Sequence, residues 1–152
     1  MITKEEIIKL LPYQPPFRFV DELTYVSDER IEGKYTYKKE EYFYQGHFPN
    51  NPITPGVILV ETMAQIGLVS LGIYLSSSEF ENKVDVIPVF TSSNVDYLSP
   101  VLPEETVIVK SSKVYFRFGK LKCKVECWNE STGKVACKGE FSGMIINKQK
   151  IE

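Results

Sequence analysis

The sequence predicts an α+β fold in which a curved antiparallel β-sheet wraps around one long, buried helix. Three observations lead to this prediction. Residues 57–75 are apolar on nearly every side and are long enough for about five helical turns. Most of the remaining chain, above all after residue 84, has the pattern of strands separated by short turns. With 152 residues, 43% of them hydrophobic, the chain is large enough for a single domain over residues 1–152 to bury such a helix.

The N-terminal segment predicts a short helix over residues 3–11. Thr3 and Glu6 have the spacing of a capping box, in which each side chain bonds the backbone of the other residue. Pro12 ends this helix. Because the next residues are rich in proline, we expect residues 11–17 to form a stiff, extended connector.

Apolar and polar residues alternate with a period of two in most of the other segments, which is typical of half-buried strands. The first pair of strands is predicted over residues 19–26 and 30–37, joined by a turn at residues 27–29. Residues 79–83 are expected to form a polar turn. The later strands are predicted over residues 84–91, 106–118, 121–128 and 134–146.

The long helix has a recognisable beginning and two polar residues inside it. Thr54 is the expected N-cap, and Pro55 suits the first helical position, where its missing N–H costs nothing. A helix that is apolar all round is buried or crosses a membrane. Glu61 and Gln65 favour burial, because a carboxylate in mid-bilayer costs roughly 2.5 kcal/mol or more. One curved sheet would cover most of the helix, and a second copy of the chain could cover the rest.

Charge and cysteine content exclude several classes of function. A net charge of −2 argues against a nucleic-acid surface. The charged N-terminus has no apolar signal core, and Cys123, Cys127 and Cys137 have neither a nearby His nor the four-ligand pattern of a zinc site. We therefore expect reduced thiols, no metal and a cytoplasmic location. Several basic residues on two adjoining predicted strands are read as a solvated face, with a docking patch for an acidic carrier protein as the alternative: Lys110, Lys113, Arg117, Lys120, Lys122 and Lys124.

The segment from Gly46 to Val57 holds the one histidine of the chain, His47, and three prolines that restrict the backbone around it. It leads directly into the long helix, which carries Glu61. A single acid/base group, a rigid turn, a helix N-terminus and a carboxyl group expected to be buried thus lie in one short window. This combination indicates proton-transfer chemistry.

The same residues resemble the β-hydroxyacyl-acyl-carrier-protein dehydratases of fatty-acid synthesis, which have the hot-dog fold. The resemblance rests on Gly46-His47-Phe48-Pro49, on Pro52-Ile53-Thr54-Pro55-Gly56-Val57, on Val60-Glu61-Thr62-Met63-Ala64-Gln65, and on the separation of fourteen residues between the His and the Glu. Fainter matches at residues 11–21 and 99–103 extend it over most of the chain.

The resemblance implies dehydration of a (3R)-hydroxyacyl-acyl-carrier-protein to the trans-2-enoyl thioester, without cofactor or metal. It implies that His47 is the catalytic base and Glu61 the catalytic acid. It further implies that the carbonyl of Ile53 orients the imidazole, the backbone N–H of Gly56 polarises the substrate carbonyl, and Gln65 steadies the carboxyl group. Each site would take His47 from one subunit of a homodimer and Glu61 from the other, and further assembly into a trimer of dimers stays open.

These assignments agree with elementary chemistry. A neutral imidazole can remove a proton from C2, and the positive end of a helix can stabilise an enolate-like oxygen near Gly56. Apolar neighbours should raise the pKa of Glu61, so that it keeps a proton for the leaving hydroxyl group. Gln65, one turn further on, can hydrogen-bond that carboxyl group.

Five aromatic residues are candidates for lining an acyl tunnel, with ordinary packing as the alternative for each: Tyr13, Phe17, Phe48, Phe90 and Tyr97. The chain departs from the family pattern near the expected substrate entrance. Tyr13 stands where a basic residue, commonly His, is usual, and Arg18 replaces an apolar residue. The loop that usually ends Pro-Gly-Asp runs Pro103-Glu104-Glu105 here.

Two other classes of function remain open. Thioesterases share this fold and also carry a carboxylate on the central helix, but they generally lack the histidine segment at residues 46–49. A non-catalytic acyl-binding subunit is the third class, and an intact pair of His47 and Glu61 argues against it. Glu rather than Asp at position 61 favours, by resemblance, a dehydratase that does not also isomerise the double bond.

Overall fold

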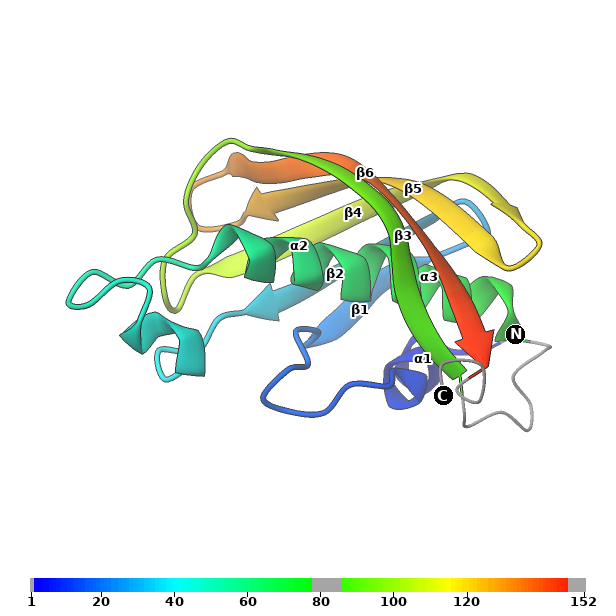
Figure 1. The fold of residues 1–152 in the computed structure, drawn as a ribbon, viewed down its shortest axis with the longest axis horizontal. Coiled ribbons are helices and arrows are strands. Elements are labelled where there is room, and N and C mark those ends of the chain that lie inside the picture. Colours follow the sequence, from blue (N-terminus) through cyan, green and yellow to red (C-terminus); the bar gives the residue numbers. More distant parts are fainter. Residues whose placement is uncertain (1, 78–85, 148–152) are drawn as a thin grey trace.

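One continuous helix of three segments runs along the concave side of the sheet (Figure 1). These segments are α2 (Gly56–Ala64), η2 (Gln65–Val69) and α3 (Ser70–Leu75). The computed structural model describes residues 2–77 and 86–147. By length and composition the helix Gly56–Leu75 could cross a membrane, but 72% of its most apolar window is buried inside the protein. The prediction of a buried core helix is therefore confirmed.

The start of this helix differs from the prediction. Pro55, not Thr54, is the N-cap, and the N–H of Ile58 donates to the Pro55 carbonyl at 2.9 Å. The Thr54 hydroxyl instead forms a 2.6 Å hydrogen bond with the hydroxyl of Tyr44. The Thr54 side chain is thus directed to the buried Tyr44, and α2 begins at Gly56 without a side-chain cap.

The middle segment, η2, is one turn of π-helix, which the sequence pattern did not predict. Both the N–H and the hydroxyl of Ser70 donate to the carbonyl of Gln65, the hydroxyl at 2.7 Å. The wider turn lies against the centre of the sheet, where the Ser111 hydroxyl donates to the Gly67 carbonyl at 2.8 Å. A Cβ at Gly67 would lie 3.0 Å from the Ser111 Cβ, so glycine permits this close approach.

The sheet is antiparallel throughout, in the order β1-β2-β4-β5-β6-β3. Its curvature brings β3 and β6 around the helix on the side opposite to β1 (Figure 1). The strands are β1 (Glu22–Val26), β2 (Arg30–Thr36), β3 (Val86–Tyr97), β4 (Thr106–Arg117), β5 (Lys120–Asn129) and β6 (Lys134–Asn147). All six predicted strands are present, but β3 continues six residues beyond its predicted end at residue 91.

The N-terminal helix α1 (Lys4–Leu10) has the predicted capping box between Thr3 and Glu6. The connector after it is not simply extended, because it turns at residues 14–17, where the N–H of Phe17 donates to the Gln14 carbonyl at 2.8 Å. A short 3-10 helix, η1 (Tyr42–Gln45), was not predicted. The turn predicted at residues 79–83 lies outside the described residues.

Candidate active site

Glu61 is half-buried on α2, and its carboxyl group is held by the side chain one turn further along the helix. The Nε2 of Gln65 donates to Oε2 of Glu61 at 2.9 Å. Desolvation raises the pKa of Glu61 above its ordinary value, and the hydrogen bond from Gln65 opposes this rise. The carboxyl group is therefore a better proton donor near neutral pH than an exposed glutamate would be.

Gln65 is fully buried and has its amide orientation fixed by two backbone groups. Its Oε1 accepts the N–H of Phe19 at 2.7 Å, and its Nε2 also donates to the carbonyl of Phe17 at 3.0 Å. Since Oε1 is occupied as an acceptor, only Nε2 can face Glu61. Oε2 of Glu61 accepts a hydrogen bond from this group, so a proton on the neutral carboxyl belongs on Oε1.

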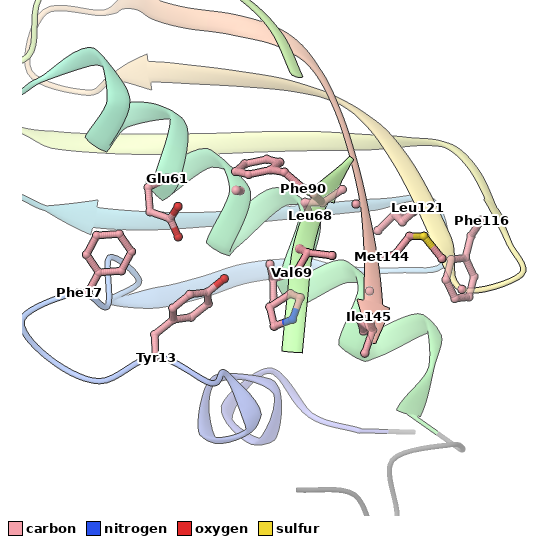
Figure 2. A pocket seen from close by; sticks show the side chains of 16 residues that line it. Tyr13, Phe17, Glu61, Leu68, Val69, Phe90, Phe116, Leu121, Met144 and Ile145 are labelled. Atoms are coloured by element: carbon pink, nitrogen blue, oxygen red, sulfur yellow. The ribbon is translucent and has the colours of Figure 1, made fainter. Parts of the chain in front are cut away.

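A cavity of about 250 Å³ opens beside Glu61 and extends along the helix. Figure 2 shows the Glu61 carboxyl group facing Phe17 and Tyr13 at one end of this cavity. Phe90 from β3 lines it as well. Three of the five aromatic candidates, Tyr13, Phe17 and Phe90, thus line one cavity together with Glu61.

Tyr13 brings a hydroxyl group into this otherwise largely apolar space (Figure 2). Burial raises the pKa of Tyr13 well above its ordinary value, and the neighbouring charge of Glu61 raises it further. The phenol therefore keeps its proton and has an O–H group that can donate a hydrogen bond.

His47 lies in the loop between η1 and α2, which projects beyond the N-terminal end of α2 (Figure 1). Its Nδ1 is 2.8 Å from the carbonyl oxygen of Ile53. A carbonyl oxygen can only accept, so Nδ1 carries the proton and Nε2 keeps the lone pair that a general base needs. The loop is closed by mutual backbone hydrogen bonds between Phe48 and Asn51, at 3.0 and 2.8 Å.

The two remaining aromatic candidates do not line the cavity. Phe48 is 48% exposed and stacks on the imidazole of His47, with ring centroids 4.0 Å apart. Tyr97 covers the start of α2, where a Cβ added to Gly56 would lie 2.7 Å from its ring. Tyr97 also lines an open hollow of about 440 Å³ between α2 and β3. Glu61 is another lining residue of this hollow.

Within the described chain, His47 and Glu61 are not brought together. Glu61 lines both the cavity and the open hollow, and His47 lines neither. Gly56 lies at the first position of α2, where helix geometry leaves its N–H without an intrahelical partner. One segment of the chain therefore carries, in order, the imidazole of His47, the helix start at Gly56 and the carboxyl group of Glu61. Within one described copy of the chain, no cavity is lined by both His47 and Glu61.

Sequence reasoning missed the residues that make the cavity long. Ala64, Leu68 and Gly72 line it along one face of the helix, three, seven and eleven positions after Glu61. This spacing is a helical stripe and could have been found by following the face that carries the glutamate. The sequence gives no such signal for the lining residues of β4, β5 and β6, because the register of the sheet places them there.

The basic residues on β4 and β5 lie among carboxylates. Lys113 pairs with Glu29 and Lys122 with Glu140, each at 3.4 Å. This arrangement favours the solvated-face interpretation over a docking patch. Among residues 2–77 and 86–147, no three His, Cys, Asp or Glu side chains gather as a metal site.

Structural comparison places this fold among known hot-dog proteins. A chain of the dehydratase heterocomplex ApeI:P from Xenorhabdus doucetiae superposes with a TM-score of 0.79, covering 99% of this chain and 96% of its own, at 14% identity. The thioesterase HI1161 from Haemophilus influenzae gives a TM-score of 0.66 over 97% of this chain and 93% of its own, at 15% identity. These likenesses show the fold and do not distinguish the two activities.

Sequence comparison is more specific. Residues 11–140 match the FabA-like domain family. A 3-hydroxyacyl-[acyl-carrier-protein] dehydratase FabZ from Geobacter metallireducens is 35% identical, with 96% of this chain and 95% of the relative covered. The protein of the same name from Acetivibrio thermocellus is 34% identical over 99% of both chains. This chain therefore belongs to the FabA-like family, in which it is a homologue of the FabZ-type dehydratases.

Proposed function

We propose that the chain dehydrates 3-hydroxyacyl groups carried on acyl carrier protein to trans-2-enoyl groups, as a step of fatty-acid synthesis or a related pathway. The observation that carries this proposal is the desolvated carboxyl group of Glu61, held by Gln65 at the end of an apolar cavity. The FabZ relatives support the same reaction class. We further propose a single cytoplasmic domain over residues 1–152.

The proposed reaction uses three groups of the chain. Nε2 of His47 takes the proton from C2, while the N–H of Gly56 stabilises the negative charge that develops on the thioester oxygen. The C3–O bond breaks, and the leaving hydroxide takes the proton from Oε1 of Glu61 and departs as water. A double bond between C2 and C3 remains. Glu61 then regains a proton and His47 loses one, which returns the site to its starting state.

A second copy of the chain is needed to complete this site. His47 and Glu61 share no cavity within the described chain, and the open hollow beside Glu61 lies at strand β3. β3 is an edge of the sheet and is twelve residues long, so its outer backbone groups are available for pairing with another strand. We propose that two copies associate along β3 and that each supplies His47 to the Glu61 of the other.

The test is a spectrophotometric dehydration assay on a 3-hydroxyacyl-carrier-protein thioester. His47→Ala and Glu61→Gln should each lower kcat by about 10²–10⁴, the usual contribution of a general acid or base. Glu5→Gln, the same change at an exposed position of α1, should leave the rate as it is. Release of free thiol without formation of the enoyl product would instead indicate a thioesterase. Wild-type rates in either site variant would rule out the proposed roles.

A further inference from the structure

We propose that Gly72 sets the length of the acyl chain that the cavity accepts, and that the preferred substrates are medium-length chains of up to about twelve carbons. This inference rests on the proposed function, because it takes the cavity beside Glu61 as the acyl site. It adds the substrate class and the residue that determines it.

The cavity follows one face of the central helix. Its helical lining includes Glu61, Ala64, Leu68 and Gly72, which succeed one another at intervals of three or four residues. Gly72 lies eleven residues beyond Glu61, and at 1.5 Å per residue this corresponds to about 16 Å along the helix. A chain whose C3 lies at Glu61 would therefore extend towards Gly72.

The far end of the cavity is apolar and meets the helix at Gly72. A Cβ added there would lie 3.7 Å from Cδ2 of Leu121 and 3.8 Å from Cδ1 of Ile145, which are ordinary van der Waals distances. Figure 2 shows Leu121, Met144, Ile145 and Phe116 together at the end away from Glu61. The space in front of Gly72 is thus about one methyl group deep before these side chains are reached, and they form the end wall.

Two measures convert this geometry into a chain length. An extended chain advances about 1.2 Å per bond, so about 16 Å admits at most about thirteen bonds. The cavity volume of about 250 Å³ holds about eight small groups at about 30 Å³ each, which is the share of one water molecule in the liquid and is close to the size of a methylene group. The volume is the tighter limit. Added to the three reacting carbons, eight groups give an acyl chain of about eleven carbons, and twelve is the next even length.

The experiment compares kcat/KM on 3-hydroxyacyl-carrier-protein thioesters of four, eight, twelve and sixteen carbons. The wild-type protein should accept chains up to twelve carbons and lose efficiency at sixteen. Gly72→Ala should lower kcat/KM for twelve carbons about fourfold, the factor for burying one methylene group. Gly72→Leu should lower it by more than tenfold. In both variants the loss on four carbons should be clearly smaller than the loss on twelve, because a four-carbon chain does not reach Gly72.

Ile145→Ala is the converse variant, since it removes part of the end wall. It should raise kcat/KM for sixteen carbons relative to twelve. Gly72→Ala introduces no contact shorter than 3.7 Å, so it decides the question even where Gly72→Leu fails to fold. An equal loss on all chain lengths, or an unchanged preference in the Gly72 variants, would overturn the role of Gly72. Absence of dehydration by the wild-type protein on every substrate would instead overturn the proposed function.

Discussion

At the scale of single residues, Glu61 illustrates how a group proposed to act in catalysis can weaken the fold. Desolvation raises the pKa of Glu61 in the folded protein above that in the unfolded chain. The folded state therefore binds more protons over the pH range between the two pKa values, and stability falls as pH rises through that range. At neutral pH the half-buried carboxyl group is a net cost to the fold.

Replacing Glu61 by glutamine should remove this cost. An amide keeps an oxygen that can accept the hydrogen bond from Gln65, but it never ionises. The free energy of unfolding of Glu61→Gln should thus exceed that of the wild type at pH 7. The two curves should meet below about pH 4, where the unfolded carboxyl group is also protonated. Urea titrations at several pH values measure the difference, and an advantage that grows towards low pH would contradict the burial argument.

Glu104 is a second residue with a local cost, because its backbone has a φ of +72°. This left-handed conformation costs a residue with a Cβ about 1–2 kcal/mol, whereas glycine adopts it freely. The family pattern Pro-Gly-Asp has glycine at the corresponding position. Glu104 is exposed, and its N–H donates to the carbonyl of Tyr37 at 2.8 Å, a bond that glycine would keep.

Glu104→Gly should therefore raise the free energy of unfolding by about 1 kcal/mol. Glu104→Ala is the matched control, since it removes the carboxylate but keeps the Cβ. Only the glycine variant should gain stability in urea denaturation. If alanine and glycine stabilise equally, repulsion between carboxylates rather than backbone strain is responsible.

At the scale of elements, the apolar patterns predicted α1, the long central helix and all six strands, but missed the 3-10 helix η1 and the second half of β3. The predicted strand ends at residue 91, and the next residues, Ser92-Ser93-Asn94, have the composition of a turn although they belong to β3. These residues are exposed on an edge strand that pairs only with β6, so no apolar alternation is needed there.

The π-turn at η2 is accompanied by a hydrogen bond from the Ser70 hydroxyl to the Gln65 carbonyl, and this bond does not alter the helical period of apolar residues in the sequence. Thr54 has a suitable residue type for an N-cap but is bonded to Tyr44.

The exposed face of the sheet carries a row of alternating charges that no single strand reveals. Directly paired positions on five neighbouring strands hold Glu32, Lys110, Glu126, Lys138 and Asp96 in that order. Opposite charges at facing positions stabilise a sheet by about 0.2–1 kcal/mol per pair, and like charges destabilise it. Such a row suits a face that remains in water.

Reversing one member of the row should weaken the sheet. Lys138→Glu places three acidic residues side by side and should lower the free energy of unfolding by about 1–2 kcal/mol. Lys138→Gln, which removes the charge without reversing it, should cost about half as much. Screening at about 1 M salt should shrink both effects. A loss of stability that salt does not reduce would point to packing of the Lys138 stem instead of charge.

At the scale of the whole molecule, the sequence motif located the chemical groups but not the site. The spacing of the motif led to His47 and Glu61, and the helix start after it led to Gly56. The cavity, however, is assembled from the connector after α1, the central helix and strands β3 to β6. Its length depends on the register of distant strands, and under the proposed function its imidazole comes from a second copy. The order of residues along one chain does not give the cavity length, whereas the sharing of sites between two copies was implied by the family resemblance.

Shared sites make a prediction that no single-chain site would satisfy. His47→Ala and Glu61→Gln subunits, each inactive alone, can be co-expressed with different affinity tags and purified as the mixed dimer. One of its two sites then contains the intact His47 of the Glu61→Gln subunit and the intact Glu61 of the His47→Ala subunit. The other site lacks both groups. The mixed dimer should therefore recover about half of the wild-type dehydration rate per dimer. If both groups of a site came from the same chain, every subunit would be defective, and the mixed dimer would be as inactive as its parents.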